Sequence, residues 1–320
     1  MQKIAVVGAG IIGLSTTLKL NQNGYNVELF SKDNPTETNS SYAGAIWDGT
    51  FKEGVYREWS EVSLLQYIQD SKSKDSGVTL KELLQIYRTE VPDPWFKNIV
   101  PMFQVISEKD KPYKAKEAHY YSVPHIDPKK YLEFLFEKVS KANTIVYREL
   151  ENLDELIDDF DIVINCSGLG ARELVKDPTM YPVFGQLLSS DSINIEHSYM
   201  DDEEFTYYFS HEDYVVFGGV ALKGKEFSKD QENITAEITQ KVQKILPQFN
   251  ESKISNIQTG VRPGRKSVRF ETEYSENTKI IHNYGHEGLG YTYAWGCASS
   301  VVKKQIQKQE PIKFEVKYSS

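Results

Sequence analysis

Short apolar runs and one longer amphipathic segment alternate over the first thirty residues of the chain. An apolar run at 4–7 leads through a glycine-rich turn into a helix-compatible segment at 11–22, and a second apolar run follows at 27–30. Asn23-Gly24 closes the helical segment with residue types that favour the left-handed backbone conformation. Strand, helix and strand in this order form a βαβ unit, which predicts a parallel sheet.

Two further segments have helical periodicity. From about 55 to 100, apolar residues beginning with Trp59 and Val62 recur with the spacing of one helix face. The segment 129–142 carries a second apolar stripe of the same kind. Apolar runs at 144–147 and 161–165 then resume the strand pattern.

The third quarter of the chain resembles antiparallel structure. Residues 205–209 and 214–219 are rich in aromatic and β-branched side chains and are joined by a polar turn. An amphipathic helix at 233–246 ends at a proline, and an apolar strand at 279–281 precedes the last glycine-rich segment. The pattern predicts an α/β fold, in which a three-layer nucleotide-binding unit is interrupted by antiparallel strands and helices.

Length, charge and hydropathy narrow the function. With 320 residues the chain can bury a sizeable core. Its net charge of −9 disfavours a nucleic-acid partner, which needs a clustered basic face. No window of about eighteen uninterrupted apolar residues occurs, so we expect no membrane span. A strand that begins at Ile4 leaves no room for a signal peptide ahead of it.

Neither the cysteines nor the histidines form a recognisable ligand set. Cys166 and Cys297 are far apart in predicted buried elements, so we expect free thiols with a packing role. The six histidines lack the spacing of a metal site, and none is predicted.

The turn Gly8-Ala9-Gly10-Ile11-Ile12-Gly13 stands between a strand and a helix, which is the arrangement that places a pyrophosphate on a helix N-terminus. The second strand ends in Ser31-Lys32-Asp33. Asp33 could bind the ribose, or Lys32 could meet the 2′-phosphate of NADP. The motif alone leaves both dinucleotide classes open.

A second glycine-rich segment near the C-terminus also suits an anion. It runs from His282 to Thr292, follows an apolar strand and leads into a helix-compatible stretch. A third strand-to-glycine turn lies at 165–171. Glycine-rich turns at opposite ends of the chain suggest one nucleotide cofactor held by both termini.

Several segments, in this order along the chain, resemble the D-amino acid oxidase family of FAD enzymes, which includes the D-aspartate oxidases. They are Val7–Ser15, Tyr42-Ala43-Gly44-Ala45-Ile46-Trp47, Asn165–Gly168, Gly185-Gln186, Gly260-Val261-Arg262-Pro263 and His282–Ala298. The resemblance spans nearly the whole chain and implies FAD rather than NAD(P).

The family implies a Rossmann-like FAD-binding domain interleaved with an α+β substrate domain that contains an antiparallel sheet. We expect the FAD-binding domain at 1–50, 143–186 and 260–320, and the substrate-binding domain at 51–142 and 187–259. The residues expected at the cofactor are Gly8, Ala9, Gly10, Ile11, Ile12, Gly13, Lys32, Asp33, Ala43, Gly44, Ala45, Leu150, Ser167, Gly168, Gly185, Gln186, Gly288, Leu289, Gly290, Tyr291 and Thr292.

The resemblance also assigns a substrate site. Arg262, in the Gly-x-Arg-Pro motif, is expected to bind the α-carboxylate through its planar fork, together with the hydroxyl of Tyr207. The alternative is that Arg262, Arg265 and Arg269 are structural partners of Glu271 or Glu273, which we favour for the latter two arginines. Tyr207 could likewise be an ordinary strand aromatic.

Two more residues complete the expected substrate contacts. The backbone carbonyl near Gly288 is expected to accept from the substrate amine, and Trp47 to line the site, with a plain core role as the alternative. The lid tyrosine of mammalian members has no counterpart, since Glu203 stands at that offset. We therefore expect open substrate access, with Tyr199 or Met200 near the mouth.

Three ionisable residues of the second glycine-rich segment, Glu287, His282 and His286, have structural interpretations as well as catalytic ones. Glu287 stands where mammalian members have glycine, and its carboxylate either faces solvent or tunes the polar end of the substrate pocket. We favour the first interpretation, because a buried carboxylate would need a partner. The resemblance makes His282 and His286 structural rather than catalytic bases.

The implied reaction is oxidative deamination of D-amino acids, with hydride transfer from substrate Cα to flavin N5. The resulting imino acid hydrolyses to the 2-oxo acid and ammonia, while O2 reoxidises the flavin and gives H2O2. An acidic side chain would need a further cation, for which Lys223, Arg57 and Arg265 are the candidates, and none is compelling. We therefore expect neutral D-amino acids.

Three alternatives stay open: D-aspartate oxidation, glycine or sarcosine oxidation, and a non-oxidase protein that binds NADP. The expected partners are a small D-amino acid and O2, with no nucleic acid and no membrane. The oligomeric state is left open, and a homodimer is one of the alternatives. The C-terminus lacks a Ser-Lys-Leu type address, so a cytoplasmic location is expected over a peroxisomal one.

Overall fold

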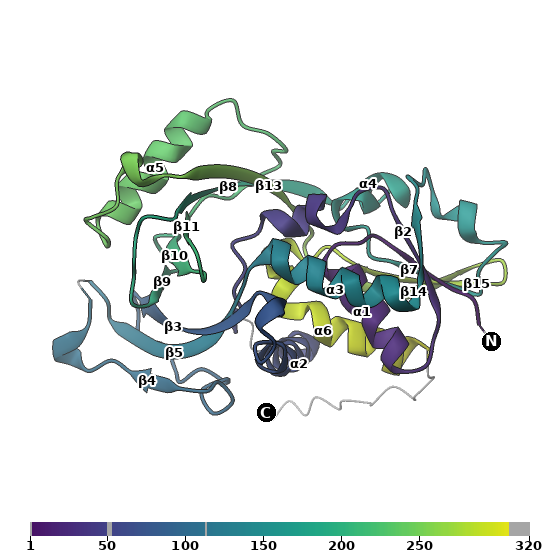
Figure 1. The fold of residues 1–320 in the computed structure, drawn as a ribbon, viewed down its shortest axis with the longest axis horizontal. Coiled ribbons are helices and arrows are strands. Elements are labelled where there is room, and N and C mark those ends of the chain that lie inside the picture. The colour runs from purple at the N-terminus through teal and green to yellow at the C-terminus, as the bar shows by residue number, and fades with distance from the viewer. Residues whose placement is uncertain (1, 50–52, 113, 307–320) are drawn as a thin grey trace, which may run out of the picture.

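The computed structural model describes residues 2–49, 53–112 and 114–306. Two sheets lie toward opposite ends of an elongated molecule (Figure 1). The first sheet has six strands in the order β14-β15-β7-β1-β2-β6. Their bounds are β1 Ile4–Val7, β2 Val27–Ser31, β6 Thr144–Tyr147, β7 Ile162–Asn165, β14 Arg269–Ser275 and β15 Thr278–Tyr284. All neighbours in this sheet pair in parallel except β14, which is antiparallel to β15.

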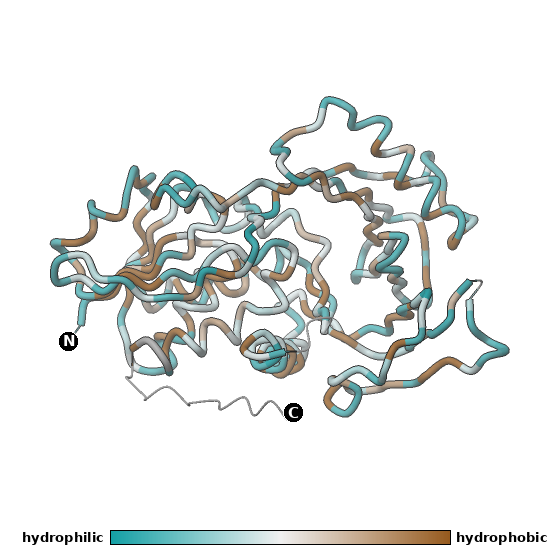
Figure 2. Tube along the Cα trace, turned by 180° about the vertical axis from the view of Figure 1, so that it is seen from behind, coloured by the Kyte–Doolittle hydropathy of each residue, from teal (hydrophilic) through white to brown (hydrophobic). Residues whose placement is uncertain are grey.

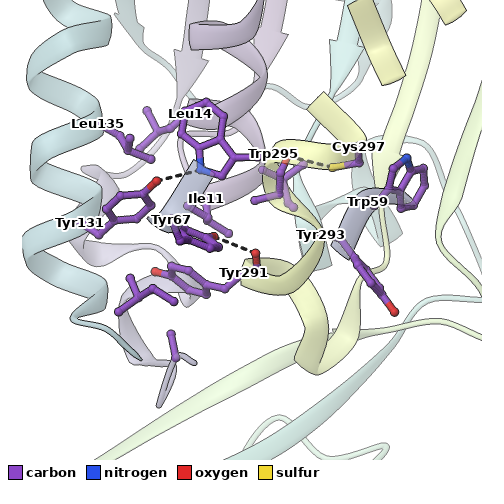
Figure 3. Close-up of a cluster of buried hydrophobic side chains, with 14 of the residues drawn as sticks. Ile11, Leu14, Trp59, Tyr67, Tyr131, Leu135, Tyr291, Tyr293, Trp295 and Cys297 are labelled. Carbon is purple, nitrogen blue, oxygen red and sulfur yellow. Dashed lines mark hydrogen bonds between the residues drawn. The ribbon is translucent and has the colours of Figure 1, made fainter. Parts of the chain in front are cut away.

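Four helices pack together beside the six-stranded sheet: α1 (Ile11–Gln22), α2 (Gly54–Asp70), α3 (Pro128–Ala142) and α6 (Gly290–Ser300). Figure 3 shows the core between them, where buried aromatic side chains also use their polar groups. The indole N–H of Trp295 donates to the hydroxyl of Tyr131 at 2.8 Å, and the Tyr67 hydroxyl donates to the carbonyl of Tyr291 at 2.7 Å. This core therefore fixes the N-terminal ends of α1 and α6 relative to each other.

The second sheet has nine strands in the order β12-β8-β11-β10-β9-β3-β5-β4, with β13 paired to β8. Their bounds are β3 Val78–Tyr87, β4 Phe103–Val105, β5 Glu117–Ile126, β8 Tyr181–Ser190, β9 Ser198–Asp201, β10 Thr206–Ser210, β11 Val215–Gly218, β12 Leu222–Lys223 and β13 Asn256–Gly264. Helix α5 (Gln231–Gln243) covers one face of this sheet and packs its buried Ile234, Ile238 and Val242 against Phe217 and Phe249. The short helix α4 (Ala171–Leu174) follows β7.

The predicted α/β class with a second, antiparallel sheet is confirmed. The first βαβ unit has the predicted bounds to within one residue, and Gly24 has the left-handed φ of 81° expected after α1. The prediction of helix from about 55 to 100 is wrong beyond Asp70, because Val78–Tyr87 is strand β3. This strand is stabilised by pairing over its whole length with β5, a distant partner that local periodicity cannot show.

Two of the predicted domain boundaries fall inside strands. The boundaries at 186/187 and 259/260 lie within β8 and β13, and both strands belong to the nine-stranded sheet. The change from one sheet to the other therefore comes before Tyr181 and after Gly264. The predicted final segment, 260–320, extends past the described residues, and the C-terminal address lies outside them.

Hydropathy follows this architecture. Figure 2 shows the most hydrophobic stretches (brown) along the strands of the six-stranded sheet and mainly hydrophilic loops at the periphery. Among residues 2–49, 53–112 and 114–306, no helix has both the length and the apolar character that crossing a bilayer requires.

Candidate active site

One cavity of about 900 Å³ joins the two sheets. It is lined by the turns that follow β1, β2 and β7, by residues of β8, β10 and β13, and by the segment 286–292 that leads into α6. A ligand site at the carboxyl ends of parallel strands is the general expectation for an open α/β sheet. The cavity is long enough to contact both glycine-rich segments and the arginine of the Gly-x-Arg-Pro motif.

The first turn provides an anion cradle. Gly8 has a φ of 106°, and a Cβ placed there would lie 2.6 Å from the carbonyl oxygen of Cys166, so only glycine fits. Helix α1 begins at Ile11 without a side-chain cap from Gly10. The Ile11 N–H donates to Ser40 Oγ at 3.0 Å. The positive end of α1 therefore faces the cavity, as a bound pyrophosphate requires.

All of the predicted cofactor residues line this cavity except Gly13 and Gln186. Gly13 serves the turn itself, because a Cβ there would lie 1.8 Å from the Gly8 carbonyl oxygen. Gln186 is a correction: its side chain is buried on the opposite face of β8, where its amide donates to Thr235 Oγ1 of α5 at 2.7 Å. Successive side chains of a strand point to opposite faces. Because Gly185 and Leu187 line the cavity, Gln186 between them points to the other face of β8.

At the far end of the cradle, Lys32 and Asp33 both line the cavity, as does Leu150. Lys32 also pairs with Glu149 at 3.4 Å, with both side chains more than half exposed. An exposed pair of this kind is weak, so it does not by itself choose between the ribose and the 2′-phosphate interpretations.

The three arginines that lie close together in the sequence have different environments. Arg265 pairs with Asp177 at 3.1 Å. Arg269 pairs with Glu271 at 2.5 Å and with Glu273 at 3.2 Å. Arg262 makes no ion pair with any residue that the structure describes, and its side chain lines the cavity. The structural interpretation thus holds for Arg265 and Arg269, and Arg262 is left with its charge directed at the ligand space.

Arg262 and Tyr207 meet in this cavity. The guanidinium of Arg262 donates to the hydroxyl oxygen of Tyr207, and it also donates to the carbonyl of Val220 at 3.4 Å. Glycines make room for both side chains, since a Cβ at Gly185 would lie 2.3 Å from Arg262 Nη1 and one at Gly218 would lie 2.3 Å from the Tyr207 hydroxyl oxygen. Phe209 stacks on the ring of Tyr207 with 4.6 Å between centroids and fixes its direction.

Burial raises the pKa of Tyr207 above its usual value, although the Arg262 charge and hydrogen bond oppose the shift. The phenol therefore keeps its proton at neutral pH and can donate to an anion. A guanidinium and a phenol side by side offer three or more donors, which matches the oxygen atoms of one carboxylate.

Trp47 is not among the described residues that line the cavity. Its side chain is fully buried, its indole N–H donates to the carbonyl of Ser60 at 2.8 Å, and its ring packs against Trp95 and Phe96. The predicted substrate contact is therefore corrected to a core position. Its neighbours Ile46 and Asp48 line the cavity instead, as expected when an extended segment alternates its side chains.

Sequence reasoning missed several cavity residues. Ser40 caps the start of α1 and its carbonyl accepts from the Tyr291 hydroxyl at 2.9 Å, which joins the two glycine-rich segments. Asp48, Asp202 and Phe205 also line the cavity. Asp48 follows the small-residue segment by three positions and was within reach of the motif argument, whereas Asp202 lies in the turn before β10, which no motif marks.

At the mouth, Met200 lines the cavity as expected, whereas Tyr199 is buried and stacks on Tyr208 with 5.5 Å between centroids. Glu287 is exposed and also lines the cavity, so both interpretations of its carboxylate stay open, and it has a left-handed φ of 49°. The His286 ring also lines the cavity, and burial lowers its pKa to about 3. A histidine with this pKa is neutral and a weak base at neutral pH.

Comparison with known proteins agrees with this geometry. Residues 3–303 match the family described as FAD dependent oxidoreductase (DAO). The D-amino-acid oxidase of Rubrobacter xylanophilus is 31% identical over 305 residues, which are 92% of this chain and 93% of that protein. The human D-aspartate oxidase is 29% identical over 317 residues, which are 92% of each chain.

Among solved structures, the glycine oxidase of Geobacillus kaustophilus superposes with a TM-score of 0.80 at 14% identity, covering 100% of this chain and 99% of that one. At this identity the superposition supports the fold alone. The family match covers the cradle, the Arg262 motif and the C-terminal glycine-rich segment together, and it settles the choice of cofactor as FAD rather than NADP. This chain belongs to the DAO family of FAD-dependent oxidoreductases.

Proposed function

We propose that the chain is a D-amino-acid oxidase that converts a D-amino acid to the 2-oxo acid, ammonia and H2O2. The observation that carries the proposal is the Arg262–Tyr207 pair. The pair has no described carboxylate to neutralise it and opens into the same cavity as the Gly8 cradle. Relatives named D-amino-acid oxidase that align over more than nine tenths of this chain support it.

When bound, FAD would supply the acceptor for the hydride that leaves the substrate Cα, and this hydride carries both electrons of the oxidation. The residues of this chain do the positioning. Gly8, Ile11 and the start of α1 receive the pyrophosphate, and the segment 288–292 lines the cavity beside them. Arg262 holds the substrate carboxylate with two parallel N–H groups, and the Tyr207 hydroxyl donates to the same carboxylate.

The substrate amine is expected to bind in its neutral form, with the carbonyl of Gly288 as its acceptor. No enzymic base is then needed, and this agrees with a cavity whose only lining histidine among the described residues, His286, is a weak base. Three fixed points, the carboxylate, the amine and the Cα hydrogen that must face the cofactor, leave one direction for the side chain and so select one enantiomer.

D-Aspartate is disfavoured as a substrate, because none of the three candidate cations lines the cavity. Lys223 lies over the ring of Tyr181, Arg57 over that of Trp95, and Arg265 pairs with Asp177. Each of the three cations therefore contacts a partner outside the cavity. Glycine and sarcosine remain as rival small substrates, which an activity assay separates directly.

The test is H2O2 release from the purified, yellow protein with a panel of D- and L-amino acids, glycine and sarcosine. The proposal expects release with D-amino acids and at least a hundredfold lower kcat/KM with their L-enantiomers. A preference for glycine, sarcosine or an L-amino acid would overturn it.

A further inference from the structure

A carboxylate stands in the active-site cavity at some distance from the arginine. Asp202 lies in the turn between β9 and β10, and it lines the same cavity as Arg262 and Tyr207. The substrate carboxylate and amine have partners elsewhere, so Asp202 faces the space available to the substrate side chain.

Hydrogen bonds fix the Asp202 side chain in place. Gln85 of β3 donates through Nε2 to Asp202 Oδ2 at 2.9 Å. The buried Tyr121 hydroxyl donates to Gln85 Oε1 at 2.6 Å, which sets the direction of the Gln85 amide. Gln85 can therefore present only its N–H groups to Asp202, and this favours the ionised, acceptor form of the carboxylate.

Strand register gives the separation between the two ends of the site. Tyr207 on β10 is opposite Met200 on β9, and Met200 is opposite Gln85 on β3. Gln85, the partner of Asp202, is thus two strands from Tyr207, or about 9.5 Å at the usual interstrand spacing. A backbone spacing of this order leaves Tyr207 and the Gln85 that holds Asp202 far enough apart to accommodate an extended substrate side chain between them.

The charge of Asp202 is not neutralised by the protein. Its neighbour Asp201 pairs with Arg88, whereas Asp202 makes no ion pair with any residue in the described part of the chain. Asp48 is another acid that lines the cavity, and its charge acts on Asp202. Asp202 is exposed as a whole residue, but the protein atoms packed around its carboxylate desolvate that group and raise its pKa to about 6, and the Asp48 charge adds to the shift.

We propose that Asp202 binds a cationic side chain, so that the preferred substrates are D-amino acids of the lysine, ornithine and arginine type. The inference rests on the proposed function, and it replaces the expectation of neutral substrates that the sequence suggested. Arg262 and Asp202 then form opposite ends of a site that is complementary to a substrate with a carboxylate at one end and a cation at the other.

The closing experiment compares D-lysine with D-norleucine, which has a side chain of similar length without the ammonium group. The wild-type enzyme should have a higher kcat/KM for D-lysine. Asp202→Asn should reduce the D-lysine/D-norleucine ratio of kcat/KM on the order of ten- to a hundredfold, because one charge-assisted hydrogen bond is lost.

Glu204→Gln is the matched control. Glu204 belongs to the same turn and its side chain does not line the cavity among the described residues, so the substitution removes one charge nearby without touching the site. The control should leave the ratio unchanged. A wild-type ratio of one or less, or an equal loss in the two variants, would overturn the inference while leaving oxidase activity established.

A binding measurement separates this inference from the proposed function. 6-Aminohexanoate is lysine without the α-amino group, and hexanoate lacks the cation as well. The yellow holoenzyme should bind 6-aminohexanoate more tightly than hexanoate by perturbation of its visible absorbance, and Asp202→Asn should abolish the difference. If no D-amino acid is oxidised but this difference is found, the oxidase proposal fails and the cation site stands. Equal affinities for the two acids would contradict the cation site.

Discussion

At the scale of single residues, the account depends on one uncompensated guanidinium. Arg262 differs from Arg265 and Arg269 only in what surrounds it, because the other two have carboxylate partners within the protein. The sequence motif singles out the same member of the three that lines the cavity without an ion pair to any described residue. The motif could not show that Trp47 is buried in the core while Ile46 and Asp48 line the cavity. Which side chains of an irregular segment face the core is decided by tertiary packing.

Replacing Arg262 by alanine should reduce kcat/KM for the best D-amino acid by about 3 to 5 kcal/mol of transition-state stabilisation, since two charged hydrogen bonds to the carboxylate are lost. Steady-state kinetics with FAD-saturated protein measure this. Arg57→Lys, at an exposed position outside the cavity, is the control and should retain full activity. A kcat/KM for Arg262→Ala within threefold of wild type would remove Arg262 from carboxylate binding.

The proposed role of Asp202 also predicts that the preference for D-lysine over D-norleucine depends on pH. Its pKa is raised to about 6, so the carboxylate is ionised above pH 6 and becomes protonated below it. The ammonium of lysine, with a pKa near 10.4, stays charged throughout this range. The D-lysine/D-norleucine ratio of kcat/KM should therefore be high at pH 7.5 and fall toward one as the pH decreases through 6. A ratio that is constant between pH 5 and 8 would count against Asp202.

At the scale of elements, local periodicity located the helices and strands of the first βαβ unit well, and it failed where long-range pairing decides. Strand β3 was taken for helix, and its partner β5 was not predicted. These two strands carry Gln85 and Tyr121, which position Asp202. The substrate side-chain end of the site was therefore hidden from the sequence, whereas the motif-bearing turns of the cofactor end were visible.

A chain of buried hydrogen bonds connects three helices beside the cofactor cradle. Trp295 of α6 donates to the hydroxyl of Tyr131 on α3, which donates to Asp70 of α2 at 2.7 Å. Figure 3 shows the first of these bonds as a dashed line between Trp295 and Tyr131.

Tyr131→Phe removes both bonds and leaves the indole N–H and one carboxylate oxygen without a partner in the core. The free energy of unfolding should fall by about 2 to 4 kcal/mol. Thermal unfolding followed by circular dichroism measures the loss, and Tyr147→Phe, at an exposed position on β6, should change Tm by less than one degree or so. Equal midpoints for the two variants would show that the chain of bonds does not stabilise the fold.

At the scale of the whole molecule, all six histidines have pKa values below the ordinary value of 6.5, in each case chiefly because of burial. The pKa is about 4 for His125 and about 3 for His211 and His286. The folded protein therefore holds neutral imidazoles that become protonated in the unfolded chain below pH 6.5.

Because the unfolded state binds more protons in this range, stability should be full above about pH 6.5 and decrease as the pH falls toward 4. Tm should drop by several degrees between pH 7 and 5. Replacing the fully buried His125 by glutamine, whose amide has no charge to gain, should flatten part of this slope. A Tm that is constant or rises over the same interval would contradict the assignment of neutral buried histidines.

The central claim is that this cavity holds FAD beside a D-amino acid whose carboxylate is bound by Arg262. Its most direct test is the visible flavin absorbance of the holoenzyme after anaerobic mixing with D-lysine, D-norleucine and their L-enantiomers. The account predicts rapid bleaching with both D-amino acids, faster at low concentration with D-lysine, and no bleaching with the L-forms. Bleaching by L-lysine, or an unchanged spectrum with every D-amino acid, would contradict it.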